Sequence, residues 1–341
     1  MSDTQVDASE PGGGEVPPLA TATELPTLDT AFPAWDGDCE EAGGVRLHVR
    51  RTDPALSPPD APMAVYLHGL GGSSTNWTDL GGLLAPWGKG VAVDLPGFGF
   101  SEPDPAFDFA LTSHADAVAR YLDGLGAGPV HLFGNSMGGA VAALLAARRP
   151  ELVRTLTLIS PAVPDLRPHP RRLSDPRVAL ALLPIVGRPA RRQLAALTPR
   201  QRAQQVIDLC FADPSTFSEQ RLAELAEEHG ARLGLSWALP ALNRSTAGII
   251  RDWFAFGSRS LWSVLREVAA PTLVVWGTQD RVISARKAAR TVRLLPQGRL
   301  LMLRNTGHVA QMEQPAAVAR AVLSMWQAVA ADRWRTLPPN G

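Results

Sequence analysis

Short apolar runs recur along the chain, and stretches of helical periodicity separate them. Each run has the length of one strand, and most lack the alternation expected of a strand with one solvated face. They lie at residues 63–67, 90–95, 129–133, 155–159, 271–277 and 299–303. Buried strands that alternate with helices predict an α/β fold, with a mostly parallel sheet and helices on both faces.

The region before these strands has a different pattern. Residues 45–50 alternate between apolar and polar side chains, and Gly43 and Gly44 precede them. A glycine pair between two extended segments favours a tight turn, so we predict a hairpin over 38–50. Helical periodicity follows at 80–87, 111–122, 140–147 and 315–330.

The interval between residues 159 and 272 contains no good strand. It is far longer than the few residues that normally connect a strand to the next element, so it must have a structure of its own. Capping boxes at 198–201 and 216–219 predict helices there, the second ending at Gly230. We therefore divide the chain into a disordered tail (1–33), a core in two parts (34–160 and 271–332), a helical lid (161–270) and a C-terminal tail (333–341).

The composition is that of a globular protein, with 45% hydrophobic and 19% charged residues. The formal net charge is zero, so charge gives no reason to expect nucleic acid as a partner. No apolar stretch reaches the roughly 18 residues of a membrane-spanning helix, and the acidic N-terminus is unlike a signal peptide. Cys39 and Cys210 define neither a disulfide framework nor a metal site. We expect a cytoplasmic protein that acts on a small molecule; its oligomeric state is left open.

The most informative motif is Gly-Asn-Ser-Met-Gly-Gly at 134–139, where an apolar strand turns into a helix. This is the setting of a G-x-S-x-G nucleophile elbow, in which a strained turn exposes a serine hydroxyl. Side chains at Gly134 or Gly138 would collide as the strand and the helix close on each other. The helix N-terminus also directs N–H groups toward a developing anion. We therefore predict that Ser136 is a catalytic nucleophile rather than part of a structural turn.

A serine hydroxyl needs a base beside it and a third group that orients the base. In the strand–elbow arrangement these partners follow in the order Ser, acid, His, on loops at the carboxyl ends of strands. Asp280 follows the strand at 271–277, and His308 follows the last strand. His308 is the predicted base for Ser136, and Asp280 is the acid that holds its tautomer. Asp165 is kept as the alternative acid.

The oxyanion of an acyl-transfer reaction needs two N–H donors. We predict the backbone N–H of Met137, directly after the nucleophile, and that of Leu70, in the loop after the strand at 63–67. Glycines at 69, 71 and 72 let this backbone approach a substrate, or they simply make a flexible turn. His68 is expected to fix the loop by hydrogen bonds rather than to act as a base.

Together these motifs resemble those of the α/β-hydrolase superfamily. The matching segments are His68-Gly69, Asp-Leu-Pro-Gly-Phe-Gly at 94–99, the elbow at 134–139, Trp-Gly-Thr-Gln-Asp at 276–280 and Gly307-His308. The resemblance covers about 63 to 330. It implies an α/β-hydrolase fold with an eight-stranded, mostly parallel sheet, a helical lid inserted between the sixth and seventh strands, a Ser-His-Asp triad, and no metal or cofactor.

The resemblance also narrows the chemistry. Epoxide hydrolases and haloalkane dehalogenases of this superfamily place Asp at the elbow, so Ser136 excludes them. The elbow is similar to that of the meta-cleavage C–C hydrolases, but these usually carry an aromatic residue after the catalytic histidine, where this chain has Val309. The leading hypothesis is a serine hydrolase that cleaves a carboxylic ester, or a related acyl bond, of a small, mostly apolar substrate. A C–C hydrolase of a diketone and a non-catalytic binding module are the alternatives.

The predicted lid has two further features. Residues 161–202 contain nine arginines against Asp165 and Asp175. This stretch is interpreted as a solvated surface, with an acidic substrate or an anionic membrane surface as alternative partners. Several aromatic residues near the end of the lid either pack on the core or form a wall of the substrate site. They are Trp237, Trp253, Phe254, Phe256 and Trp262.

Overall fold

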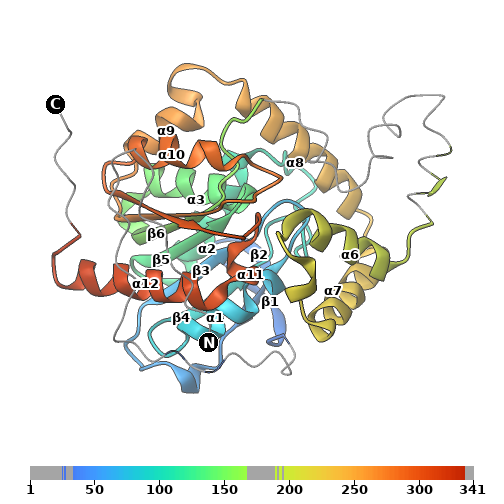
Figure 1. Cartoon of the computed structure of the whole chain (residues 1–341), viewed down its shortest axis with the longest axis horizontal. Helices are drawn as coiled ribbons and strands as arrows, with labels where there is room; N and C mark the ends of the chain where they lie inside the picture. Colours follow the sequence, from blue (N-terminus) through green and yellow to red (C-terminus); the bar gives the residue numbers. More distant parts are fainter. Residues whose placement is uncertain are drawn as a thin grey trace.

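The strands form one sheet, which lies between layers of helices (Figure 1). Their order in the sheet is β1-β2-β4-β3-β5-β6-β7-β8. The computed structural model describes residues 34–166 and 196–334, together with Leu25, Thr27, Pro189, Arg192 and Gln193. The pairings β1–β2 and β2–β4 are antiparallel, and the others are parallel. The strands are β1 Gly37–Ala42, β2 Val45–Arg51, β3 Met63–Leu67, β4 Lys89–Val93, β5 Val130–Asn135, β6 Val153–Ile159, β7 Thr272–Gly277 and β8 Gly298–Leu303. The predicted fold class and the eight-stranded sheet are confirmed.

The turn between β1 and β2 follows from its two glycines. Gly43 and Gly44 have φ values of 58° and 69°, in the left-handed region that glycine adopts without strain. Two consecutive positive φ values match the twist of an antiparallel hairpin. The hairpin expected over 38–50 is therefore present, with β1 beginning at Gly37 and β2 ending at Arg51.

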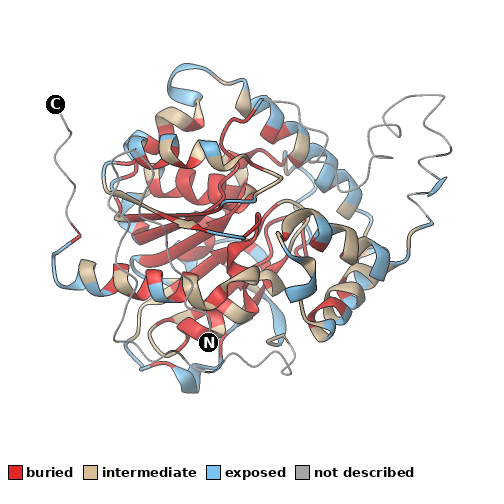
Figure 2. Ribbon diagram, viewed as in Figure 1, coloured by how far each residue is buried: buried red, intermediate tan, exposed pale blue. Residues whose placement is uncertain are grey.

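Helices cover both faces of the sheet, which explains why its central strands are apolar throughout. Every residue of β5 and of β7 is buried, and Figure 2 shows the buried residues concentrated in the sheet and on the helix sides that face it. One face packs on α2 Leu111–Leu125, α3 Met137–Arg148, α9 Leu261–Glu267 and α10 Ala288–Leu294. The other packs on α1 Thr78–Leu84, α11 Ala310–Glu313 and α12 Pro315–Ala330.

The described residues between β6 and β7 form helices, as their sequence pattern indicates. These are α6 Pro199–Cys210, α7 Glu219–Arg232, α8 Ala238–Trp253 and α9; we call α6 to α9 the helical insertion. An apolar cluster joins α6 and α7 to Val309 of the core. Most of the arginine-rich stretch at 161–202 lies outside the described residues, as do most of the two tails. None of the helices in the described ranges has both the length and the apolar character of a membrane-spanning segment.

The capping box predicted at the start of α6 is confirmed. The Thr198 hydroxyl accepts a hydrogen bond from the Gln201 N–H at 3.2 Å, and the Gln201 side chain accepts one from the Thr198 N–H at 2.9 Å. Pro199 is the first helical residue, where its missing N–H costs no hydrogen bond.

The capping box predicted for α7 is wrong. The N-cap is Ser218, whose hydroxyl accepts from the Arg221 N–H at 3.2 Å. Thr216 instead closes a short 3-10 turn, and its hydroxyl donates to the Asp213 carbonyl at 2.8 Å. Both serine and threonine favour N-cap positions, and the preceding turn decides between them. Gly230 does not end the helix, which continues to Arg232.

Two buried histidines lie in the core, in α2 and β5. His114 is fully buried among three phenylalanine rings. His131 stacks on Trp326 with the ring centroids 4.0 Å apart. Burial lowers the pKa of both imidazoles to about 3, because an apolar environment disfavours the charged form.

Acidification should therefore destabilise the fold. The unfolded chain protonates each histidine near an ordinary pKa of about 6.5, whereas the native imidazoles stay neutral down to about pH 3. Between these values the unfolded state binds more protons, so the free energy of unfolding falls by about 2 kcal/mol per histidine from pH 7 to pH 5. Urea titrations at the two pH values measure this loss. In the His114→Phe variant, the loss of unfolding free energy between the two pH values should be smaller by the contribution of one histidine. An undiminished loss would contradict the lowered pKa of His114.

Candidate active site

The predicted elbow has the backbone that its motif requires. β5 ends at Asn135, α3 begins at Met137, and Ser136 between them has φ 53° and ψ −116°. A positive φ in a serine is strained and persists only where the surroundings enforce it. A Cβ on Gly134 would lie 2.3 Å from the Gly138 carbonyl oxygen, and one on Gly138 would lie 2.2 Å from the Leu67 carbonyl oxygen. Only glycine fits at these two positions, as the sequence predicted.

Asp280 and His308 meet above the neighbouring strands β7 and β8. The Asp280 Oδ2 lies 2.9 Å from the His308 Nδ1, and the two side chains are 0% and 5% exposed. The other oxygen, Oδ1, accepts the N–H groups of Val282 and Ile283 at 2.8 and 2.9 Å. The carboxylate is therefore fixed at both oxygens. With Nδ1 donating to Asp280, the neutral imidazole presents Nε2 as a proton acceptor.

Asn135 connects the elbow to the histidine loop. Its side-chain N–H₂ donates to the His308 carbonyl and to the Ile159 carbonyl, each at 3.1 Å. The Ser136 N–H also donates to the Ile159 carbonyl, at 3.0 Å. Among the described residues, the His308 ring is hydrogen-bonded to Asp280 and not to the Ser136 hydroxyl. Catalytic hydrogen bonds of this kind are often long without substrate and tighten when it binds.

The loop after β3 lies directly against the elbow. A Cβ on Gly69 would be 3.1 Å from the Ser136 Cβ, so glycine is what lets this loop approach the serine. The predicted oxyanion donors, Leu70 and Met137, are thus on adjoining segments. Neither N–H is a donor in the loop and turn hydrogen bonds of the described residues, so both amides are available to a ligand.

His68 has the structural surroundings expected of it. Its Nδ1 lies 2.7 Å from the Gly69 carbonyl oxygen, and its Nε2 accepts the Leu95 N–H at 3.0 Å. Burial lowers the pKa of the imidazole. Both ring nitrogens are occupied, so His68 holds the loop in place and has no nitrogen left to act as a base.

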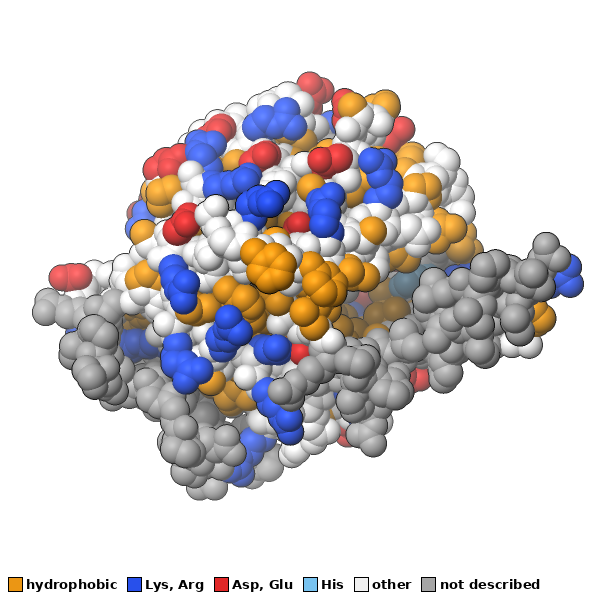
Figure 3. Space-filling view, turned by 90° about the horizontal axis from the view of Figure 1, so that it is seen from above, with side chains coloured by type: hydrophobic (Ala, Val, Ile, Leu, Met, Phe, Trp, Pro, Cys, Tyr) orange, Lys and Arg blue, Asp and Glu red, His pale blue; other side chains and the backbone are white. Residues whose placement is uncertain are grey.

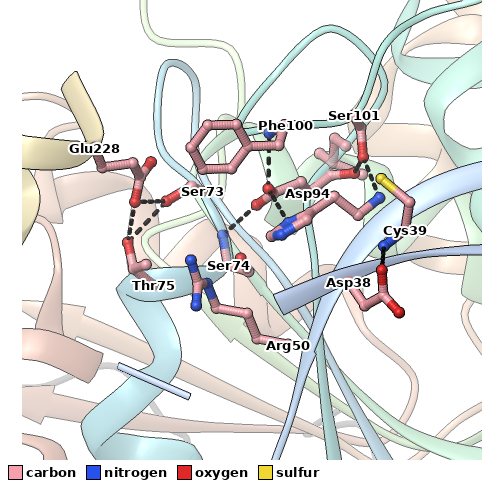
Figure 4. A network of polar contacts seen from close by, with 12 residues as sticks. Asp38, Cys39, Arg50, Ser73, Ser74, Thr75, Asp94, Phe100, Ser101 and Glu228 are labelled. Carbon is pink, nitrogen blue, oxygen red and sulfur yellow. Dashed lines mark hydrogen bonds and ion pairs between the residues drawn. The ribbon is translucent and has the colours of Figure 1, made fainter. Parts of the chain in front are cut away.

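Asp94 is an organising residue whose role the sequence did not reveal. Its carboxylate accepts the Ser74 N–H at 2.6 Å and the Phe100 N–H at 2.9 Å (Figure 4). It also lies 2.7 Å from the His48 Nδ1. Burial opposes ionisation, but the hydrogen bond to His48, the nearby His68 and His48 imidazoles and the Phe100 N–H keep the pKa of Asp94 below its usual value. The sequence feature that could have indicated this role is the position of Asp94 at the end of an apolar strand.

Glu313 is a second residue that the sequence analysis missed. One carboxylate oxygen accepts the Gly307 N–H at 2.6 Å, and the other accepts the N–H of Ala212 at 2.9 Å. The His308 N–H also donates to the Cys210 carbonyl at 2.6 Å. The loop that carries His308 is therefore held from the end of α6, in the helical insertion, as well as from the core.

The chain matches a known family over most of its length. A family described as the alpha/beta hydrolase fold matches residues 64–315. The chain belongs to the alpha/beta hydrolase family.

Two relatives and one solved structure are similar to this chain. A dihydrolipoyllysine-residue acetyltransferase component of an acetoin cleaving system from Cupriavidus necator is 33% identical over 275 residues, covering 80% of this chain but only 64% of that protein. A 2-hydroxy-6-oxononadienedioate/2-hydroxy-6-oxononatrienedioate hydrolase from Pseudomonas putida is 29% identical over 275 residues, covering 78% of this chain and 88% of that protein. The crystal structure of a serine hydrolase from Cycloclasticus zankles aligns with a TM-score of 0.68 at 18% identity, covering 86% and 98% of the two chains.

The alternative acid of this hydrolase, Asp165, has other partners. It is completely buried, and its Oδ2 accepts the Ser284 N–H at 2.9 Å. The Lys287 ammonium lies 3.6 Å from its Oδ1. The structure thus pairs Asp280, and not Asp165, with His308.

The aromatic residues near the end of the helical insertion have mixed roles. Trp253 and Trp262 pack against the main core cluster, and the Trp253 indole N–H donates to the Ala162 carbonyl at 2.9 Å. Phe256 is 84% exposed. Trp253, Phe256 and Trp262 also line an open groove of about 560 Å³, together with Arg266, Lys287 and Arg290. On this face, hydrophobic side chains gather with Lys and Arg around them (Figure 3), but no triad residue lines the groove.

Within the described ranges, no group of three or more His, Cys, Asp or Glu side chains is arranged to hold a metal ion. Cys39 and Cys210 are both free thiols.

Proposed function

We propose that this hydrolase cleaves a carboxylic ester, or a related acyl bond, of a small and mostly apolar substrate through an acyl-enzyme. The observation that carries the proposal is the strained Ser136 at the start of α3, joined through Asn135 to a His308 whose Nδ1 is held by Asp280. This arrangement provides a nucleophile, a base with its acceptor nitrogen free and an acid that orients the base.

In the proposed reaction, the Ser136 oxygen attacks the ester carbonyl as His308 Nε2 removes its proton. Asp280 stabilises the resulting imidazolium. The negative charge on the carbonyl oxygen is received by the N–H groups of Leu70 and Met137. As the bond to the alcohol breaks, His308 returns the proton to the leaving oxygen, and Ser136 is left acylated. Water then repeats the cycle and releases the acid, so that no cofactor takes part.

An apolar substrate is supported by the side chains beside the proposed catalytic groups. Met137 and Val309 follow the nucleophile and the base, and both are buried. Leu70, in the loop facing the elbow, packs against the main core cluster. The surroundings of the proposed catalytic groups are therefore hydrocarbon rather than charge, which suits an apolar substrate.

Cleavage of a C–C bond in a diketone is the second candidate. It is favoured by the 29% identity to the hydrolase from Pseudomonas putida, whose name denotes an oxo-dienedioate substrate. The same serine, histidine and acid could serve either reaction. Val309, where the meta-cleavage hydrolases usually carry an aromatic residue, makes this the weaker candidate.

A direct comparison of substrates should distinguish these candidates. We expect p-nitrophenyl butyrate to be hydrolysed with a kcat/KM at least about 100-fold above that for a vinylogous 1,5-diketone. The ratio of the two kcat/KM values is measured by steady-state kinetics on the purified wild type, with Ser136→Ala as the blank. A larger value for the diketone would replace the ester proposal by C–C hydrolysis. Turnover of neither, with no labelling by a fluorophosphonate, would favour a binding module.

A further inference from the structure

Helix α7 of the insertion reaches the loop that carries the proposed oxyanion donor Leu70. The Glu228 Oε2 lies 2.9 Å from the Ser73 hydroxyl and 2.8 Å from the Thr75 hydroxyl (Figure 4). The two hydroxyls are themselves 2.8 Å apart. Two hydroxyl protons serve these three contacts, so at least one donates to Glu228 at any time.

Arg232 extends this contact by one helical turn. Its guanidinium pairs with the Glu228 Oε1 at 3.1 Å and donates through both terminal nitrogens to the Gly71 carbonyl at 3.3 Å. The Glu228 and Arg232 side chains are only 6% and 13% exposed. A buried charge is stable only when its partners are in place, so this contact tolerates little displacement.

The core holds the opposite side of the same loop. His68 is bonded to the Gly69 carbonyl, and Asp94 accepts the Ser74 N–H. Leu70 lies between Gly69, which the core holds, and Gly71, which Arg232 holds. The direction of the Leu70 N–H therefore depends on the core and on α7 together.

We propose that Glu228 and Arg232 are positioning residues that set the oxyanion loop, so that the oxyanion site is complete only while α7 is docked on it. This inference rests on the proposed function, because it takes Leu70 as an oxyanion donor. An oxyanion donor acts in the transition state more than in substrate binding. Removing the Glu228 carboxylate should accordingly lower kcat and leave KM nearly unchanged.

The test compares Glu228→Ala with two matched controls, one in α7 and one in the core helix α1. Glu227→Ala changes an exposed neighbour in α7. Asp79→Asn weakens another buried link between α7 and the core, the Arg221–Asp79 pair at 2.8 Å, which does not touch the oxyanion loop. We expect Glu228→Ala to lower kcat for p-nitrophenyl butyrate by about 10- to 100-fold with KM within about threefold. Both controls should keep kcat within about threefold, although Asp79→Asn should lower the melting temperature.

The rate of labelling by a fluorophosphonate gives a second readout, since phosphonylation of Ser136 also develops charge on an oxyanion. It should fall in Glu228→Ala in parallel with kcat. Should that variant not fold, Glu228→Gln combined with Ser73→Ala takes its place and should show the same pattern. Suppose that the wild type is labelled and active, but Glu228→Ala keeps the wild-type kcat and labelling rate, or Asp79→Asn loses as much kcat as Glu228→Ala. Either result would overturn this inference and leave the proposed function standing. A wild type that is never labelled would overturn the proposed function as well.

Discussion

Replacing Ser136 by alanine should lower kcat for a p-nitrophenyl ester by about 10⁵- to 10⁶-fold, which is the scale of loss when the nucleophile of a triad is removed. The change deletes one oxygen and leaves the backbone as it is. Alanine meets the same strain at φ 53° that serine already bears. The protein should therefore remain folded, with an unchanged circular dichroism spectrum and a melting temperature within a few degrees of wild type.

Ser160 provides a matched control for this experiment. It is also a buried serine with a positive φ, 43°, and it follows β6, the strand next to β5. Ser160→Ala removes the same oxygen from the same kind of backbone without touching the proposed triad, so kcat should stay within about threefold of wild type. More than a few per cent of wild-type activity in Ser136→Ala would contradict the nucleophile assignment.

Replacing Asp280 by asparagine should lower kcat by about 10⁴-fold, equivalent to about 5.5 kcal/mol of transition-state stabilisation. In the native site, Oδ2 receives the proton of His308 Nδ1 and Oδ1 receives two backbone N–H groups. Asparagine satisfies the backbone groups with its oxygen and then turns its N–H₂ toward the ring. The imidazole must then accept a hydrogen bond at Nδ1 and carry its own proton on Nε2, so that Nε2 can no longer remove a proton from Ser136.

Asp165→Asn is the control for the acid, because Asp165 is the other buried carboxylate that the chain order allows. Its partners are the Ser284 N–H and the Lys287 ammonium, so its loss should lower the free energy of unfolding while kcat falls by less than about tenfold. Measurements of kcat and of urea unfolding on both variants separate the two roles. A larger loss of kcat in Asp165→Asn than in Asp280→Asn would reverse the assignment.

The sequence predicted best those features that neighbouring residues determine. The elbow, the hairpin glycines and the helix at 315–330 each depend on a pattern that is complete within a short segment. The pairing of Asp280 with His308 was also predictable, because the loops after two adjacent parallel strands emerge at the same edge of the sheet. β7 and β8 are such neighbours, with Gly277 opposite Leu303.

Other features depend on contacts between distant residues. The start of α7 was misplaced because the turn that begins at Asp213 uses Thr216 and leaves the cap to Ser218. Glu228 is an ordinary charged residue on a helix until the fold brings Ser73 and Thr75 to it across more than 150 positions. Asp94 and Glu313 are likewise defined by the backbone N–H groups that surround them. Patterns along the chain do not contain such partners.

Acylation of Ser136 is tested most directly by an acid-quenched, pre-steady-state burst experiment. Wild-type protein mixed with excess p-nitrophenyl butyrate should release a burst of nitrophenol, and peptide mass spectrometry should find the butyryl group on Ser136. Asp280→Asn should greatly slow the burst, and Ser136→Ala should abolish it. Rapid turnover with no acylated peptide, or with the acyl group on another residue, would contradict the mechanism.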